Sequence, residues 1–528
     1  MRPFTDKNNY GVAMKRTLLS IAFLLALVAA SAQQRGSGSA SQFNRSQSVQ
    51  ADDPLRSWVL DLQQTIRMAN DSSLEAFRSK NLYLSGYWSW RTYKANRLPN
   101  LTLTATPAKY YRYFVERYDS ENDMDVYRTQ QYFYSAGSLV LSQNFDLTGG
   151  TFTLESDLGY TRYFGSSRYT QITTAPIMVG YSQDLLGYNA FRWDRKIEPL
   201  KYEKVKKEFL YNTEAVSESA TTYFFDLAAA QAEYDLACDN VASTDTLYSI
   251  GQERFKIAAI SRADLLTLKL DAINAHNTLR NTESDLKRAM SALATFLNLG
   301  RDTHIRVVLP GRPREIRISV DEALAAARAN NPTLLSYRQE VLEAEQEVDR
   351  TRRESRLNAS LSLSAGFNQA ADRMSEAYRN LLQKEMVSLT LSFPLIDWGV
   401  SRGKYNMARS TLAATRIEAQ QNQVSVEEEV VMTVNDFNTQ LELVTSASEA
   451  YDLSILAYNE TRQRFIIGKA DMSSLTLAQN RQQEALTNYI AALQEYWEQY
   501  YKIRRLTLWD FESGFSLSDK FDYNTLLR

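Results

Sequence analysis

The sequence predicts a mixed α/β membrane protein in which long helices and a few strands occur twice, as two internal structural repeats. Three observations lead to this fold class. The chain has 528 residues and an N-terminal export signal, but beyond that signal it has no run of about 20 apolar residues. Long stretches without proline favour long helices, and short segments of alternating polarity favour strands.

The N-terminus has the three parts of a secretory signal. A positively charged start at 14–16 precedes an apolar run at 18–30, and small residues at 30–32 suit cleavage. We therefore expect residues 1–32 to be a signal peptide, with Met14 as the true start and 33–55 as a polar N-terminal segment.

The composition argues against several classes of protein. The 60 Lys+Arg and 62 Asp+Glu residues give a formal net charge of -2, without the basic excess that nucleic-acid binding requires. One cysteine, Cys238, and two histidines, His276 and His304, exclude a disulfide framework and a multi-histidine metal site. No nucleophile elbow, phosphate loop or metal-ligand spacing occurs. We expect no enzyme, no catalytic residue, no cofactor and no bound metal.

Two stretches favour long helices. The first separates Pro199 from Pro310, and the second follows Pro394; both are rich in Ala, Glu, Gln and Leu. An uninterrupted helix over 400–461 would measure roughly 90 Å at about 1.5 Å per residue. The second stretch carries an apolar seam with the spacing of a coiled coil, made of Val430, Val434, Phe437, Leu441, Val444, Tyr451, Ile455 and Tyr458.

The two halves of the chain match each other. Residues 254–257 (RFKI) correspond to 464–467 (RFII), whereas 58–61 correspond to 318–321 at an offset about 50 residues larger. The first half therefore contains an insertion of that size, which could lengthen loops or add strands. We expect a first repeat at 56–300, a linker at 301–317, a second repeat at 318–510 and a C-terminal tail at 511–528.

Strands are predicted at the same place in both halves, at 99–184 and 358–396. Alternating residues mark 359–365 and 387–393 in the second half, and 101–105 and 177–183 in the first. Two further candidates in the first half, 138–145 and 151–160, meet at the turn signal Gly149-Gly150.

So few strands cannot close a barrel from one chain, and lipid does not tolerate open strand edges, so several copies must pool their strands. The aromatic residues of the strand region fit interfacial girdles around a lipid-facing band: Tyr110, Tyr111, Tyr113, Phe114, Tyr132, Tyr160, Tyr163 and Phe164.

Three segments carry a resemblance to a known family. They are 320–334 (VDEALAAARANNPTL), 393–399 (FPLIDWG) and 464–468 (RFIIG), with first-half counterparts at 183–193 and 254–257. Their order, spacing and duplication resemble the TolC-like outer-membrane efflux proteins, in the branch typical of Bacteroidetes-type bacteria. The resemblance covers essentially the whole mature chain.

The resemblance implies a homotrimer in the cell outer membrane. Its strands would close one transmembrane β-barrel in the outer-membrane lipid, and its helices would form an antiparallel coiled-coil barrel, a tunnel through the periplasm. Such proteins are passive exit ducts of a tripartite efflux pump or a type I secretion system. They receive substrates from a periplasmic adaptor and an inner-membrane transporter.

In this family the helix–turn–helix tips meet the adaptor and close the periplasmic end; here the tips are 254–268 and 464–477. We expect Gly468 to adopt a positive φ; its first-half counterpart is Ala258. The expected docking residues are Arg254, Phe255, Arg464, Phe465, Gly468 and Leu475. Candidate gate residues are Asp264, Asp471, Ser474 and Leu477.

The gate departs from the family pattern. Many relatives place carboxylates six and nine residues after the tip glycine, where this chain has Ser474 and Leu477. Asp264 and Asp471 are the nearest acids. A periplasmic coiled-coil adaptor or scaffold remains the alternative function, since it would also be exported and helical.

Overall fold

The computed structural model describes residues 58–164, 168–300 and 303–527. The predicted signal peptide and the polar segment 33–55 lie outside these ranges. The chain divides into two units: of the described residues, the first holds Trp58, Thr303 and His304, and the second holds 59–164, 168–300 and 305–527. The second contains almost all of the described residues and is described below. Among the helices of the described ranges, none is long and apolar enough to cross a membrane.

Helices of the second unit occur in two series with the same order. The first series has 11, 22, 67 and 35 residues, and the second has 11, 23, 67 and 36, as an internal repeat predicts. The series are α2 (Leu62–Ser72), α3 (Leu74–Ala95), α4 (Ala190–Lys256) and α5 (Arg262–Phe296), then α6 (Val320–Asn330), α7 (Pro332–Glu354), α8 (Val400–Ile466) and α9 (Met472–Thr507).

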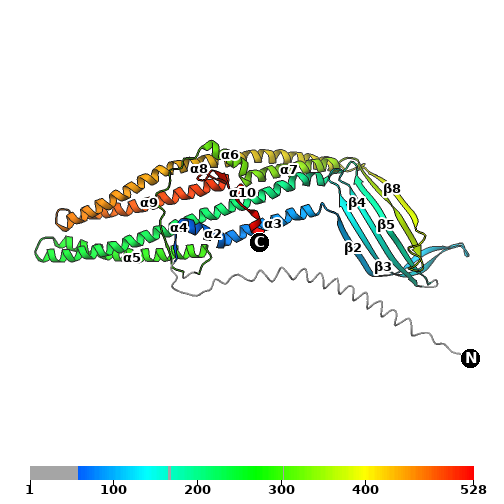
Figure 1. Cartoon of the computed structure of the whole chain (residues 1–528), viewed down its shortest axis with the longest axis horizontal. Coiled ribbons are helices and arrows are strands. Elements are labelled where there is room, and N and C mark those ends of the chain that lie inside the picture. Colours follow the sequence, from blue (N-terminus) through cyan, green and yellow to red (C-terminus); the bar gives the residue numbers. More distant parts are fainter. Residues whose placement is uncertain (1–57, 165–167, 301–302, 528) are drawn as a thin grey trace, which may run out of the picture. The chain divides into compact units, whose positions relative to one another are not determined.

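One six-stranded antiparallel sheet interrupts both series and lies at one end of the long helices (Figure 1). Its strand order is β2-β3-β4-β5-β7-β8, so β2 and β8 form its outer edges. The strands are β2 (Asn100–Asp119), β3 (Met124–Asn144), β4 (Thr151–Phe164), β5 (Thr170–Asp184), β7 (Asn358–Ala371) and β8 (Leu382–Ser392).

The extra residues of the first half therefore extend the sheet. Four strands separate α3 from α4, but only two separate α7 from α8. The alternation at 101–105 predicts only the beginning of β2, which continues past a bulge between Thr106 and Lys109. That bulge contains Pro107, which cannot donate a ladder hydrogen bond and interrupts the period of two.

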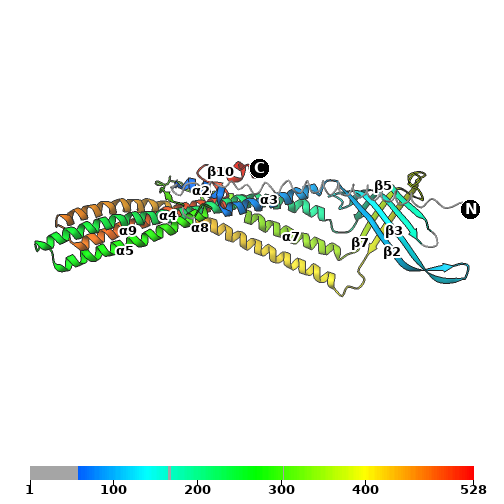
Figure 2. The ribbon, with the colours of Figure 1, turned by 90° about the horizontal axis from the view of Figure 1, so that it is seen from below.

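The long helices form two hairpins, α4–α5 and α8–α9, and α4 packs against α9. The seam predicted in α8 is buried at Val430, Val434, Phe437, Leu441 and Val444. The Phe437 ring lies 4.9 Å from the ring of Tyr496 in α9. The N-terminal half of α8 diverges from α3 and α4 (Figure 2), and the apolar residues Ile417 and Val424 are exposed there.

Proline does not mark the start of α4, because Pro199 lies inside it. The helix begins nine residues earlier, where the Asn189 side chain accepts a hydrogen bond from the backbone N–H of Arg192 at 3.1 Å. Proline lacks a backbone N–H, so its position near the N-terminal end costs the helix one hydrogen bond rather than ending it.

The C-terminal residues fold back onto the helices. The short elements β9 (Trp509–Asp510), β10 (Phe515–Ser516), α10 (Leu517–Lys520) and η1 (Tyr523–Leu527) follow α9. The Tyr523 ring stacks on Tyr83 of α3 at 5.7 Å, and Leu508 is completely buried beside Phe209 of α4. The predicted tail is thus a packed part of the helical core. The short strands β1 (Trp58–Leu60) and β6 (Ile305–Val307) also pair.

Candidate functional site

Both predicted tips lie at turns between long antiparallel helices. The first turn, 257–261, joins α4 to α5, and the second, 467–471, joins α8 to α9. The backbone hydrogen bonds of the two turns are equivalent. Ala259 N–H donates to Arg254 C=O at 2.9 Å, and Lys469 N–H donates to Arg464 C=O at 2.8 Å.

Gly468 has a φ of +75°, which confirms the positive φ expected there. Its counterpart Ala258 adopts the same left-handed conformation, with a φ of +54°. A β-carbon in this region costs about 1–2 kcal/mol, so the first tip keeps a strained residue where the second has glycine. The two tips therefore have the same backbone conformation, but its conformational free energy is higher in the first tip, which has alanine, than in the second, which has glycine.

Asp264 and Asp471, the two acids proposed for the gate, cap the helices that follow these turns. Asp264 and Ser261 form a capping box at the start of α5, and the Asp471 carboxylate accepts from the N–H of Ser474 at the start of α9. The two tips therefore exchange the acid and the serine between equivalent positions. Hydrogen bonds from Ser261 lower the pKa of Asp264, and hydrogen bonds from Ser474 lower the pKa of Asp471.

Arg254 connects the two tips. Its Nη2 donates to the Ile466 carbonyl oxygen at 2.5 Å, at the C-terminal end of α8. A positive side chain is favourable there, because the last carbonyl groups of a helix lack partners. Arg464 is exposed.

Beneath the turns lies an apolar cluster that joins the hairpins. Leu247, Leu268 and Leu475 are buried in it, and Phe465 packs against them. Leu475, expected among the docking residues, is only 1% exposed, so it holds the tips together and presents no surface to a partner.

Several apolar residues of the tips are exposed. Phe255 is one of the predicted docking residues, but the sequence-based prediction did not include Ile257 and Ile467. Phe255 is 41% exposed, and Ile257 and Ile467 are 76% and 65% exposed. The last two occupy equivalent positions at the start of each turn. Their signal in the sequence is a large aliphatic residue where a turn usually carries a polar one.

The remaining gate candidates, Ser474 and Leu477, line a groove between α8 and α9. Leu477 is half exposed, and Ser454, Ala457 and Arg481 lie in the same groove.

The strand register gives the sheet two different faces. Side chains alternate between faces, and residues that lie opposite each other share one. The apolar face carries Leu101, Leu103, Leu139, Leu141, Leu154, Val179, Leu363, Val387, Leu389 and Leu391. The polar face carries Asn100, Thr102, Thr104, Ser138, Ser142, Thr153, Ser182, Ser362, Ser364, Ser388 and Thr390.

The predicted girdle aromatics divide between these faces. By register, Tyr110, Phe114, Tyr160 and Phe164 lie on the apolar face, and Tyr111, Tyr113, Tyr132 and Tyr163 lie on the polar face. Only the first group is where a lipid-facing girdle requires it. The second forms a tyrosine cluster, in which the rings of Tyr111 and Tyr132 stack at 4.8 Å and those of Tyr163 and Tyr169 at 4.4 Å.

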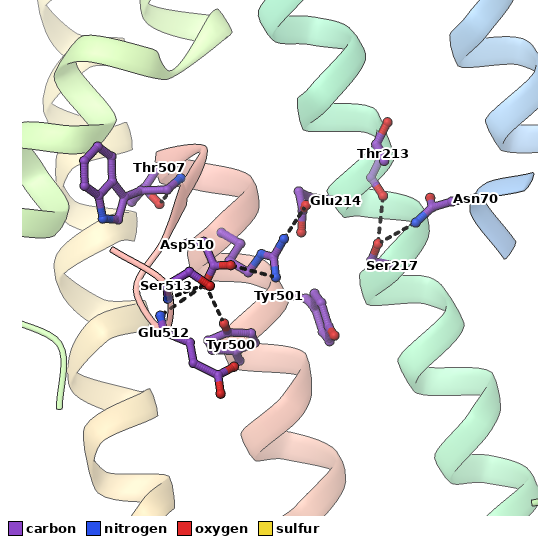
Figure 3. Close-up of polar contacts among 12 residues, drawn as sticks. Asn70, Thr213, Glu214, Ser217, Tyr500, Tyr501, Thr507, Asp510, Glu512 and Ser513 are labelled. Atoms are coloured by element: carbon purple, nitrogen blue, oxygen red, sulfur yellow. Dashed lines mark hydrogen bonds and ion pairs between the residues drawn. The ribbon is translucent and has the colours of Figure 1, made fainter. Parts of the chain in front are cut away.

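A buried polar network joins α4, α9 and the C-terminal segment (Figure 3). Arg504 Nη2 donates to Glu214 at 3.0 Å, Arg504 Nη1 lies 3.9 Å from Asp510, and the Tyr500 hydroxyl donates to Asp510 at 3.0 Å. Burial raises the pKa of Glu214 despite its pairing with Arg504. No sequence motif marks this network, because its members are brought together by folding.

Comparisons with known proteins agree with this architecture. The profile of the family described as outer membrane efflux protein matches residues 323–507. No curated protein sequence matches the chain.

Solved structures share its fold. The Campylobacter jejuni CmeC outer membrane channel aligns with a TM-score of 0.62 at 12% identity, covering 88% of each chain. The outer membrane protein VceC of Vibrio cholerae aligns with a TM-score of 0.59 at 14% identity, covering 84% of this chain and 95% of that one. The Neisseria gonorrhoeae MtrE outer membrane channel, in its open state, gives 0.56 at 13%, covering 84% and 88%.

Proposed function

We propose that this chain is a member of the outer membrane efflux protein family, whose profile matches residues 323–507, and that three copies form a passive exit duct in the outer membrane. The duct conducts substrates from a periplasmic adaptor and an inner-membrane transporter to the exterior, in a tripartite efflux pump or a type I secretion system. It binds no cofactor and catalyses no reaction.

The observation that carries the proposal is the two-faced sheet with its two unpaired edges. Among the described strands, β2 and β8 each pair on one side only. An edge in lipid leaves backbone groups without partners, which costs several kcal/mol for each group. Closure with other copies removes that cost, turns the apolar face to lipid and encloses a polar passage.

The helices suit the periplasmic part of such a duct. Each of α4 and α8 has 67 residues and would extend about 100 Å at about 1.5 Å per residue. Exposed apolar residues on the N-terminal half of α8, such as Ile417 and Val424, provide a surface for a neighbouring copy. The proposed repeats, 56–300 and 318–510, then contribute one hairpin tip each.

We assign adaptor docking to the tips, through Phe255, Ile257 and Ile467 with Arg464. Arg254, Phe465, Gly468 and Leu475 keep the turns in shape. Asp264 and Asp471 act on the closed gate by fixing the first turns of α5 and α9, and Ser474 and Leu477 line the groove beside it.

Substitution at Gly468 tests this function. Gly468→Val puts a β-branched residue at a φ of +75° and distorts the turn, so drug resistance or secretion should be lost while the trimer still assembles. Gly311→Val, in the linker between the repeats, is the matched control, because a β-carbon at Gly311 meets no atom within 4 Å. Unchanged transport in the Gly468→Val variant would contradict the docking assignment.

The mass of the detergent-extracted protein tests the assembly itself. Light scattering, corrected for detergent, should give a trimer from purified outer membranes. A monomer in the soluble periplasmic fraction would overturn the duct and favour the adaptor or scaffold function.

A further inference from the structure

We infer that the assembled barrel has eighteen strands, and that β8 of one copy pairs with β2 of the next copy with Asn100 opposite Ser392. The inference rests on the proposed trimer and deepens it. It identifies the occupant of the two open sheet edges as a second copy of this chain and fixes the register of the contact.

The strand number follows from the six-stranded sheet of each copy. Three copies contribute β2-β3-β4-β5-β7-β8 three times, and the open edges at β2 and β8 are where copies can join. Barrels of 16–18 strands enclose an aqueous channel, whereas barrels of about 8 strands are filled by their own side chains. The strands added in the first half therefore widen the passage.

The faces of the edge strands restrict the register to steps of two residues. A shift of one residue would bring leucines of one copy next to the threonines and serines of the other. With Asn100 opposite Ser392, Leu101 meets Leu391 and Leu103 meets Leu389 on the apolar face. Thr102 meets Thr390 on the polar face.

The exposure of these residues fits the same pairing. Leu101 and Leu103 are 61% and 71% exposed, and Leu389 and Leu391 are 57% and 61% exposed. Burying two such pairs per junction removes exposed apolar surface at the edges. Seven residues of β2, from Asn100 to Thr106, can pair before the bulge that contains Pro107.

The stagger of the sheet selects one register among the allowed ones. A row of opposed residues runs from Asn100 through Ser142, Thr153, Gly180 and Ser364 to Met386, which lies six residues before Ser392. Each copy then offsets the strands by six residues. With a rise of about 3.3 Å per residue and a strand spacing of about 4.8 Å, the tilt is about 35°, inside the usual range for membrane barrels.

The neighbouring registers fit less well. A stagger of four residues per copy lowers the tilt to about 25°, below that range. A stagger of eight residues places Asn100 opposite Pro394, beyond the end of β8, where proline cannot donate to the ladder.

Disulfide trapping distinguishes the three registers. In a Cys238→Ala background, Thr102→Cys is combined in turn with Thr390→Cys, Ser388→Cys or Ser392→Cys, all on the polar face. Directly opposed residues lie about 4.5–5.5 Å apart between α-carbons, within disulfide range, whereas diagonal neighbours lie about 7–8 Å apart. Each single-cysteine variant serves as its control.

The expected result is a ladder of covalent dimers and trimers on a non-reducing gel for the Thr102/Thr390 pair alone, sensitive to reductant. Predominant cross-linking of Thr102 with Ser388 or Ser392 would overturn the register. If the Cys238→Ala parent is trimeric but Thr102→Cys forms no cross-link with any of the three partner cysteines, the strand junction is overturned and the exit duct still stands. A monomeric parent would overturn the proposed function, and the inference with it.

Discussion

Removal of Arg504 should destabilise the helical core far more than removal of an exposed charge. Arg504 contacts two carboxylates, Glu214 and Asp510, and its side chain is 19% exposed while theirs are 9% and 12% exposed. Among the residues that the structure describes, the Oε2 atom of Glu214 already has no hydrogen-bond partner. Arg504→Met would leave both carboxylates buried without their cation.

The size of the expected destabilisation follows from the loss of the positive charge that pairs with the two buried carboxylates. Breaking a buried ion pair by removing one partner costs about 3–5 kcal/mol, mostly as the penalty of the charge left behind. The double variant Arg504→Met/Glu214→Leu removes the charge as well, so it should recover at least half of the stability lost by Arg504→Met. Such non-additivity is expected only for residues in contact.

Denaturation of the detergent-solubilised trimer, followed by circular dichroism, measures the effect. Because large membrane assemblies often unfold irreversibly, unfolding rates at one temperature should accompany the midpoints. Lys287→Met is the control: Lys287 pairs with Glu283 at 2.7 Å on the surface of α5, and its loss should leave the midpoint unchanged. A double variant as unstable as the sum of its single variants would refute the reasoning.

The pH dependence gives a second test with a defined sign. Burial raises the pKa of Glu214, and loss of Arg504 raises it further. A carboxyl group with a raised native pKa holds its proton when the unfolded chain has lost it, so the native state gains stability as the pH falls towards about 4.3. The deficit of Arg504→Met relative to wild type should therefore shrink from pH 8 to pH 5. A constant or growing deficit would contradict the assignment of the buried charge to Glu214.

Two further paired substitutions test the tips and the sheet. Ala258→Gly should relieve the strain of the left-handed alanine and slow local opening of the first tip, whereas Gly468→Ala should speed local opening of the second tip. Hydrogen exchange of the turn amides should show a change of about 1 kcal/mol in the free energy of opening for each variant. Changes of the same sign in the two variants would refute the strain argument. In the sheet, Leu103→Arg should reduce outer-membrane assembly, because an arginine at a lipid-facing position costs up to about 2–4 kcal/mol, while Thr104→Arg on the polar face should assemble normally. Equal assembly of the two arginine variants in outer-membrane fractions would mean that the faces are assigned wrongly.

The long helices and their turns could be read from the sequence because local signals specify them. The lack of proline after Pro394 and the seven-residue apolar spacing predict α8, whose seam residues Val430 and Phe437 are buried. The repeated RF-I motif predicts the two turns at their observed places.

The outer part of the sheet was less accessible to the same reasoning. Beyond the bulge at Thr106/Lys109, β2 and β3 carry charged and aromatic residues on both faces, so no apolar period of two marks them. The division of the tyrosines between faces depends on that one-residue shift and on the register with β3. The Arg504 network depends on contacts between residues almost 300 positions apart, which no local pattern records.

The strand order also constrains how the chain acquires its structure. No more than six residues of sequence separate each of the strands β2 to β5 from the next, so each can pair as soon as its neighbour is present. The pairing of β5 with β7 must wait until α4, α5, α6 and α7 have returned the chain to the same edge. Contacts between residues far apart in sequence form slowly, because loop closure comes before the contacts that reward it. The meander β2–β5 can therefore form early, while β7 and β8, with the edge offered to the next copy, are completed last.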